Sequence, residues 1–500
     1  MILKPRLEDI KTIGYYLGKV IVCLGFTFFI PVALGLVLKE VNPALDFLIG
    51  GAITLISGLL LTFFCRTEKD LNWMQGMIVV SLSWLAAAIL GAIPFYLSGH
   101  WKSFLDAWFE AMSCFATTGL TLAQGLDHLS YSHNLWRHLS PFIGGQGIAI
   151  IALSLFVKGT AGAFRMYVGE GRDERLVPNV INTARFIWLI SIVYLVLGTI
   201  VLGAVGISIG LRPFNAFFHA VCIFMAGFDT AGFAPQSQSI LYYHSLLFET
   251  VAILFMVLGA LNFNLHYQVW IGNRKEMFKN IETRTFFLSI LLIFFITAAG
   301  LTSLGVYPQA IVLFRKGFFQ LLSSHTTTGY MTIYARQFIN EWGSLALLGI
   351  ICSMALGGCI CSTAGGIKML RVGIIFKALV QDIKRIILPD RAIVVQKFHH
   401  IREVFLEDKL VRSALMVTVC YFVLYGAGAL VGMAYGYPFL DSLFESTSAA
   451  ANVGFSCGIT DAAMPAGLKL TYIIQMWAGR LEFMSIFTLI GAAVAAVKGK

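Results

Sequence analysis

Long apolar stretches alternate with short polar stretches from one end of this 500-residue chain to the other. Ten of the apolar stretches are long enough to cross a lipid bilayer, because a membrane-spanning helix needs about 20 apolar residues. The pattern therefore predicts an all-α polytopic membrane protein with about ten transmembrane helices. The predicted spans are 13–38, 47–65, 76–98, 136–158, 185–209, 245–270, 285–306, 342–368, 410–435 and 469–496.

Four further apolar runs lie between these spans and are too short to cross a bilayer. Runs of this length are typical of re-entrant segments. Non-spanning backbone is tolerated at membrane depth only where protein surrounds it or where it lines water. We therefore expect the spanning helices to enclose the four runs, which lie near 104–118, 214–230, 313–327 and 439–452.

Composition and charge favour a membrane protein and disfavour a nucleic-acid partner. Only 12% of the residues are charged, against about 25% in soluble domains. The net charge is +10, but the basic residues lie in loops between apolar segments rather than in one patch. If the N-terminus is cytoplasmic, the inside segments hold 26 of the 36 Lys and Arg residues and the outside segments hold eight. This bias predicts that both termini are cytoplasmic and that the short runs enter from outside.

Each short run ends in a similar phrase, in which a glycine follows small or hydroxyl residues. The phrases are FEAMSCFATTGLT (109–121), FMAGFDTAGFA (224–234), FFQLLSSHTTTGYMT (318–332) and FESTSAAANVGFS (444–456). An apolar helix precedes and follows each one. The chain is therefore predicted to contain four repeats of helix, pore helix, filter loop and helix, after two extra N-terminal helices. The predicted boundaries are 1–70 for the helix pair and 71–160, 161–272, 273–398 and 399–500 for the repeats.

The dehydration of a cation is the chemistry that suits this arrangement. Four extended segments that converge on one axis offer rings of carbonyl oxygens, which replace the water shell of an ion. A glycine allows a segment to adopt positive φ, so that successive carbonyls face the axis. The C-terminal ends of the pore helices, which are partially negative, would point inward.

The four phrases, with FIGGQGIAI (142–150), GGCICSTAGGIKMLR (357–371) and WAGRLEFMSIFTL (477–489), resemble the Trk/Ktr/HKT potassium transporter superfamily, and within it the TrkH-like pore-forming subunits. The resemblance extends over nearly the whole chain. It implies potassium uptake across the bacterial inner membrane through a pseudo-four-fold pore, in a homodimer. It also implies a cytosolic regulatory ring of the TrkA type, which would carry the nucleotide (NAD or ATP), and no covalently bound cofactor on this chain.

The resemblance assigns four filter segments that would bind K⁺. They are Thr117, Thr118 and Gly119; Thr230, Ala231 and Gly232; Thr327, Thr328 and Gly329; and Asn452, Val453 and Gly454. Glycine at Gly119 favours potassium, because relatives with serine there are linked with sodium permeation. In the second repeat Gly227 is a rival to Gly232, which we prefer because counting back from residues 262–267 reaches it without a gap. Gln146 stands where the family usually has an apolar residue, and we assign it no role.

The stretch GGCICSTAGGIKMLR interrupts the predicted span 342–368. The resemblance implies an intramembrane gating loop at 357–366, directly below the third filter segment. We expect its glycines to loosen the helix, its hydroxyl groups to satisfy the freed backbone groups, and Lys368 to mark the cytoplasmic end. The gating residues would be Gly357, Gly358, Ser362, Thr363, Gly365 and Gly366. The basic stretch that follows serves either as a positive-inside anchor or as a docking surface for the partner, and it contains Lys368, Arg371, Lys377, Lys384, Arg385 and Arg391.

Two charged residues, Arg480 and Glu482, lie inside the last predicted span. An ionisable group at membrane depth is costly and is a functional hypothesis by default. The resemblance places Arg480 beside the pore below the filter, where its charge would repel cations. A structural ion pair between neighbouring helices is the alternative.

Other classes of function fit the chain less well. We expect no enzyme, because no acid–base pair or metal-ligand spacing recurs and residues 357–368 do not match the GxxxxGK[ST] phosphate loop. An alternating-access solute carrier typically has inverted two-fold repeats, whereas the four units here share one orientation. Coupling of potassium flux to Na⁺ or H⁺, as in symporters of the same superfamily, stays open.

Overall fold

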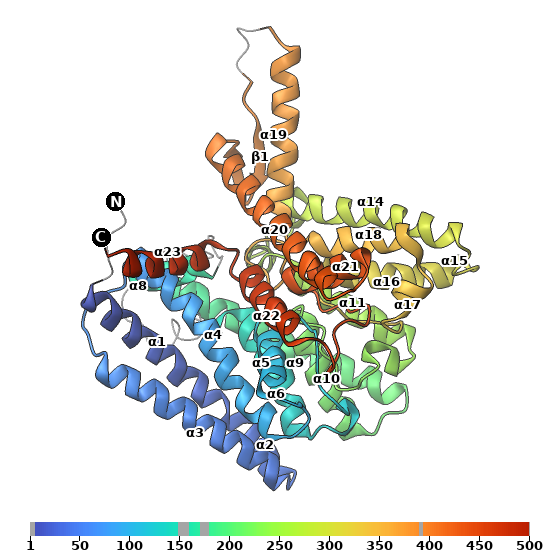
Figure 1. Cartoon of the computed structure of the whole chain (residues 1–500). Coiled ribbons are helices and arrows are strands. Elements are labelled where there is room, and N and C mark those ends of the chain that lie inside the picture. The colour runs from blue at the N-terminus through green and yellow to red at the C-terminus, as the bar shows by residue number, and fades with distance from the viewer. Residues whose placement is uncertain (1–5, 149–159, 171–179, 390–393, 500) are drawn as a thin grey trace.

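The computed structural model describes residues 6–148, 160–170, 180–389 and 394–499, which are almost entirely helical (Figure 1). Among the described residues, six helices are long and apolar enough to cross a membrane when α1 and α2 are taken together. The prediction of an all-helical polytopic membrane protein is therefore confirmed. The six are α1 (Leu7–Thr27) with α2 (Phe29–Val37), α3 (Val41–Phe64), α4 (Trp73–Leu97), α9 (Val180–Ser208), α14 (Ile281–Ser303) and α20 (Asp408–Ala434).

Two of the predicted spans are sharply bent. The helices α11 (Leu246–Ala260) and α12 (Phe263–Trp270) meet at 100°, and α22 (Ala466–Arg480) and α23 (Met484–Lys498) meet at 114°. At the first bend Asn262 starts a new helix, because its side chain accepts a hydrogen bond from the N–H of Asn264. At the second bend Glu482 and Phe483 have positive φ values of 51° and 73°, which an α-helix does not allow.

Two more predicted spans contain shorter helices. The helix α6 (Tyr131–Gln146) begins before the predicted span 136–158 and ends within it, and the end of that span falls outside the described residues. Within 342–368 lies α18 (Gly343–Ala355), which has only 13 residues. The described part of the chain therefore has six spans, or up to eight if each bent pair counts as one, rather than the predicted ten or so. The length of an apolar stretch does not show whether the helix within it bends or ends early.

The four half-length apolar runs form short, largely buried helices. Three of them are α5 (Phe104–Phe115), α10 (Pro213–Phe228) and α21 (Phe439–Ala450). The third run begins as α15 (Ala310–Val312), continues through the π-helical turn η3 (Leu313–Phe318) and ends in α16 (Phe319–His325). We call these four the pore helices, and every residue of α16 is buried.

The first helices lie at one flank of the molecule, where α1 packs along α3 and α4 (Figure 1). The start of α1 and the end of α23 lie close together, on the side from which α19 projects (Figure 1). The N-terminal helices therefore lie to one side of the four repeats that contain the pore helices. Short elements connect the larger ones: η1 (Leu126–His128), α8 (Thr160–Gly169), η2 (Ser239–Tyr243), α13 (Glu276–Lys279) and α17 (Gln337–Asn340).

A helix and a small hairpin project from one side of the bundle (Figure 1). They consist of α19 (Met369–Ile387) and the antiparallel strands β1 (Lys397–His400) and β2 (Arg402–Phe405), which the sequence analysis did not predict. His399 Nε2 lies 3.0 Å from the Glu276 carboxylate of α13. The hydrogen bond with Glu276 raises the pKa of His399 and fastens the hairpin to the bundle.

Candidate functional site

The four predicted filter segments share one backbone conformation. Two residues after each pore helix comes a residue with positive φ: Thr117 (54°), Thr230 (51°), Thr327 (54°) and Asn452 (55°). Two residues later comes a glycine with positive φ: Gly119 (97°), Gly232 (64°), Gly329 (87°) and Gly454 (89°). Gly227, the rival in the second repeat, lies inside α10. The equivalence of the four turns therefore favours Gly232.

The glycines bring the four segments into a closed ring, which we call the filter ring. If Gly119 carried a Cβ, that atom would lie 2.5 Å from the carbonyl oxygen of Ala231 in the next segment. The same relation continues at 2.1 Å from Gly232 to Thr328, 1.9 Å from Gly329 to Val453 and 2.1 Å from Gly454 to Thr118. Each position therefore requires glycine for space as well as for positive φ. All four predicted segments meet around one axis.

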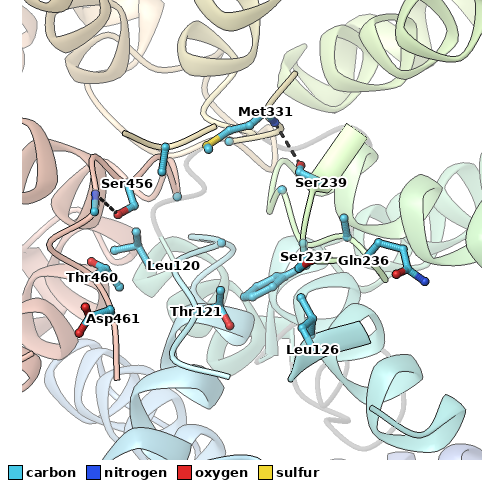
Figure 2. A pocket seen from close by; sticks show the side chains of 18 of the residues that line it. Leu120, Thr121, Leu126, Gln236, Ser237, Ser239, Met331, Ser456, Thr460 and Asp461 are labelled. Atoms are coloured by element: carbon cyan, nitrogen blue, oxygen red, sulfur yellow. Dashed lines mark hydrogen bonds between the residues drawn. The ribbon is translucent and has the colours of Figure 1, made fainter. Parts of the chain in front are cut away.

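An open cavity of about 370 Å³ lies at one end of the filter ring and is lined by all four of its glycines. Side chains from all four repeats surround the cavity (Figure 2). The repeats are also tied together here, since the N–H of Met331 donates to Ser239 Oγ at 3.1 Å. The cavity is thus a mouth that the four repeats form jointly. The lining residues labelled in Figure 2 are, repeat by repeat, Leu120, Thr121 and Leu126; Gln236, Ser237 and Ser239; Met331; and Ser456, Thr460 and Asp461.

Buried acceptors hold the chain that leaves the filter ring. In the first repeat, Glu110 accepts hydrogen bonds from the N–H of Leu122 at 3.0 Å and the hydroxyl of Thr121 at 2.9 Å. Its carboxylate also pairs with Arg137 Nε at 2.9 Å. Both charged side chains are almost completely buried, so the removal of either one would leave the other uncompensated. The pair fixes the exit of the first filter segment.

The sequence analysis did not identify a role for the buried polar residues at this position of the repeats. Gln320 and Glu445 stand, like Glu110, seven residues before the first residue of a filter segment. Gln320 Nε2 donates to Thr332 Oγ1 at 2.9 Å, just beyond the third segment. The signal is visible in the phrases, because phenylalanine followed by Glu or Gln recurs in three of them, whereas the second repeat has Ile223 at this position.

Replacing Glu445 with alanine should lower thermal stability. The Glu445 carboxylate accepts from the N–H of Cys457 at 2.9 Å, the N–H of Ile459 at 3.2 Å and the hydroxyl of Thr460 at 2.7 Å. Each buried donor left without an acceptor costs roughly 1–3 kcal/mol. We expect the melting temperature in detergent to fall by roughly 5–10 °C. Glu341→Ala, at an exposed site, is the control, and an equal shift in both variants would contradict the bracing role of Glu445.

The intramembrane loop (357–366) is not helical. It lies between α18 and α19 and folds back on itself, so that the N–H of Gly357 donates to the carbonyl of Ile367 at 3.0 Å. A Cβ on Gly357 would lie 1.7 Å from the carbonyl oxygen of Gly365. The glycines therefore allow two strands of backbone to touch. The expectation that they loosen a continuous helix was wrong, because the helix has already ended at Ala355.

The loop is anchored on the bend between α11 and α12. The N–H of Cys359 donates to the carbonyl of Ala260 at 2.9 Å, and a Cβ on Gly358 would lie 2.6 Å from the same oxygen. Ser362 Oγ donates to the carbonyl of Cys359 at 2.6 Å, and Gly366 turns the chain back with a φ of 65°. The loop therefore packs against the bend between α11 and α12.

The loop contacts the base of the filter ring. The N–H of Gly365 donates to Thr327 Oγ1 at 2.8 Å. Thr363 Oγ1 donates to the carbonyl of Phe228 at 2.9 Å, and Thr230 Oγ1 lies 3.4 Å from the same hydroxyl. These residues belong to the second and third repeats. The loop thus covers the ring on the side opposite the mouth.

Arg480, at the end of α22, contacts the base of the ring at the first repeat. Its guanidinium donates to Thr117 Oγ1 at 3.4 Å in the first filter segment and to the carbonyl of Thr363 at 2.5 Å in the loop. It also donates to the carbonyls of Gly144 at 2.9 Å and Gly145 at 3.1 Å at the end of α6. Arg480 and the loop therefore form one plug beneath the filter ring.

The residues just below the plug depart from the sequence-based expectation. Lys368, expected to mark the cytoplasmic end and to belong to the basic anchor or docking stretch, is 6% exposed and donates to the carbonyl of Ala364. Glu482 pairs with Arg371 and lies 4.0 Å from Lys368. Lys384 and Arg385 are exposed on α19, and Arg391 lies outside the described residues. The loop end is thus clamped by charges from α19 and from the bend between α22 and α23.

A second acid, Glu282 at the start of α14, links the loop to its surroundings. Its carboxylate accepts from the N–H of Ile360 at 2.7 Å and from Asn262 Nδ2 at 3.1 Å. It also lies 3.9 Å from His400 Nδ1 of the hairpin. One buried carboxylate therefore contacts the loop, the broken helix and the projecting hairpin.

A mouth, a ring of four equivalent segments and a plug within a bundle of spanning helices define a membrane transport protein with several passes through the bilayer. A family model described as TrkH, cation transport protein, matches residues 44–494. The chain belongs to this family, whose members transport cations and are not enzymes.

Individual relatives are similar over most of the chain. An uncharacterized cation transporter of Methanocaldococcus jannaschii is 32% identical over 487 residues, which cover 96% of this chain and 95% of the relative. The Trk system potassium uptake protein TrkH of Escherichia coli is 25% identical over 489 residues, covering 96% and 98%. The crystal structure of the potassium transporter TrkH from Vibrio parahaemolyticus has the same fold, with a TM-score of 0.82, 23% identity and coverage of 96% and 98%.

Proposed function

We propose that this chain conducts potassium ions into the cell through the filter ring. The observation that carries the proposal is the ring of four equivalent segments, closed by glycine contacts and covered by one plug. Two of the similar proteins are named as potassium uptake or transport proteins, which supports potassium as the cation.

The twelve filter residues supply what a dehydrated cation needs. Backbone carbonyls of four segments around one axis replace the water shell of the ion. The pore helices end two residues before Thr117, Thr230, Thr327 and Asn452, so their partially negative ends lie beside the ion path. Glycine rather than a larger residue at Gly119 keeps the ring as open in the first repeat as in the other three.

The intramembrane loop and Arg480 act as the gate in this proposal. In the closed arrangement, the hydrogen bonds of Gly365, Thr363 and Arg480 hold the plug against the base of the ring. A cytosolic regulatory ring of the TrkA type, which binds NAD or ATP, would open the plug by acting on α19 and the hairpin. We place these elements and both termini in the cytoplasm of a bacterial cell, because the basic loops lie on that side.

The assembly we propose is a homodimer of chains, each with its own ion path. Each chain consists of the N-terminal helix pair (1–70) and four repeats at 71–160, 161–272, 273–398 and 399–500. The similarity of the filter turns in the four repeats supports these boundaries.

Growth rescue of a potassium-uptake-deficient bacterium at low potassium tests this function. We expect the chain to restore growth, and to restore it more strongly when a cognate regulatory subunit is expressed with it. Repeating the assay at several external pH values and sodium concentrations separates simple potassium conduction from H⁺- or Na⁺-coupled symport. Failure to rescue with both subunits present in the membrane would contradict the potassium assignment.

A further inference from the structure

Asp229 is a buried carboxylic acid at the lower end of the filter ring. It directly follows α10, precedes Thr230 and has no exposed surface. The equivalent residues in the other repeats are Ala116, Thr326 and Ala451, none of which is charged. An ionisable residue at membrane depth is costly and marks function by default. The end of a helix makes the cost larger, because it already carries a partial negative charge.

Two neighbours hold this carboxylate in place. Gln146 Nε2 donates to Asp229 Oδ1 at 2.7 Å, and both side chains are completely buried. Beside Gln146, a Cβ on Gly145 would lie 2.5 Å from the same oxygen. The glycine therefore leaves room for the carboxylate, and Gln146, which had no role in the sequence analysis, orients it.

The same turn at the end of α6 also contacts Arg480. The guanidinium donates to the carbonyl of Gly145 at 3.1 Å, so Arg480 bonds to the residue against which the Asp229 carboxylate lies. Arg480 further donates to the carbonyl of Thr363 in the loop, and Thr363 donates to the carbonyl of Phe228, directly before Asp229. The negative and the positive charge therefore belong to one contact network at the plug.

We propose that Asp229 is a permeation-determining residue, which offsets the charge of Arg480 at the base of the filter ring. The inference rests on the proposed function, in which Arg480 lies on the cation path. A guanidinium alone repels a cation that leaves the ring, and a nearby carboxylate lowers this barrier. Both effects are larger in a low-dielectric interior than in water. Asp229 is thus the residue that allows cations to pass an arginine.

A double-mutant cycle on the full chain, measured as rubidium uptake into proteoliposomes, tests this proposal. Asp229→Asn keeps the shape of the side chain and an oxygen that accepts from Gln146. We expect Asp229→Asn to lower uptake roughly tenfold, Arg480→Gln to raise it roughly tenfold, and Asp229→Asn to change uptake less than about twofold in the Arg480→Gln background. Asp70→Asn, which removes an exposed carboxylate outside the repeats, is the control and should leave uptake unchanged.

The outcomes separate this proposal from the function on which it rests. An equal loss in both backgrounds, or no loss on Asp229→Asn, would overturn the role of Asp229 and leave the proposed ion path intact. Unchanged uptake in Arg480→Gln would contradict the ion path, and the inference would fall with it. If Asp229→Asn does not give a monodisperse protein, Gln146→Leu replaces it, with a smaller loss that should likewise disappear in the Arg480→Gln background.

Discussion

Replacing Gly329 with alanine should reduce potassium uptake to that of cells without the protein. Its φ of 87° is unfavourable for any residue with a Cβ, and the added atom would lie 1.9 Å from the carbonyl oxygen of Val453. A rotamer change does not relieve an overlap between a Cβ and backbone, so the ring must open. Because ion dehydration depends on oxygens from all four segments, one displaced segment disables the whole ring. Uptake of rubidium by potassium-depleted cells measures the effect.

Gly436→Ala is the matched control for Gly329→Ala. Gly436 has nearly the same φ, 91°, but a Cβ there would meet no atom within 4 Å. It therefore imposes the backbone strain, roughly 1 kcal/mol or more, without the collision. We expect Gly436→Ala to keep most of the uptake. Equal uptake in the two variants at equal expression would show that close contact in the ring is not required for transport.

Deleting residues 358–365 should raise potassium uptake that occurs without a regulatory partner. The deletion removes the contacts of Gly365 with Thr327 and of Thr363 with Phe228 at the base of the ring. Each such hydrogen bond contributes about 0.5–1.5 kcal/mol, so uptake should rise on the order of tenfold or more. The remaining ends can join, because a Cβ on Gly366 would lie 3.0 Å from the nitrogen of Gly357. Rubidium influx into proteoliposomes that contain this chain alone measures the change.

A graded variant and a control accompany the deletion. Thr363→Val keeps the shape of the side chain but removes the hydroxyl that contacts Phe228, so we expect a smaller rise in uptake. Thr418→Val removes a hydroxyl that bonds only within α20 and should leave uptake unchanged. A deletion protein that is inserted and monodisperse but shows low uptake would contradict the role of the loop as a plug.

Part of the structure of the filter segments can be predicted from the sequence alone. The four phrases share a glycine after small or hydroxyl residues, so the positive-φ turns at Gly119, Gly232, Gly329 and Gly454 were within reach of pattern analysis. The buried polar residues Glu110, Gln320 and Glu445 were visible in the same phrases but carried no obvious meaning. Their role depends on which hydrogen-bonding groups the folded chain brings near them. The spacing of residues along the sequence does not reveal these partners.

The intramembrane loop illustrates the opposite case. Its glycines and its place below the third filter segment were predicted, but the reason for the glycines was not. They permit contact with Ala260, which lies about a hundred residues earlier in the chain, and with the other side of the loop. Lys368 was placed in the basic stretch at the cytoplasmic end, yet it is buried, donates to the carbonyl of Ala364 and lies 4.0 Å from Glu482, which is more than a hundred residues later in the chain.

By itself, the sequence determined the class of protein and showed the four recurring phrases, but it did not determine how many apolar segments form continuous spans. These follow from apolar length, charge distribution and recurring local patterns, which are properties of contiguous residues. Only the tertiary structure decided the bends at 100° and 114°, the closure of the filter ring, the seat of the plug and the meeting of Asp229 and Arg480 at Gly145. Each of these depends on contacts between residues far apart in the chain, and hydrophobicity along the chain does not encode such contacts.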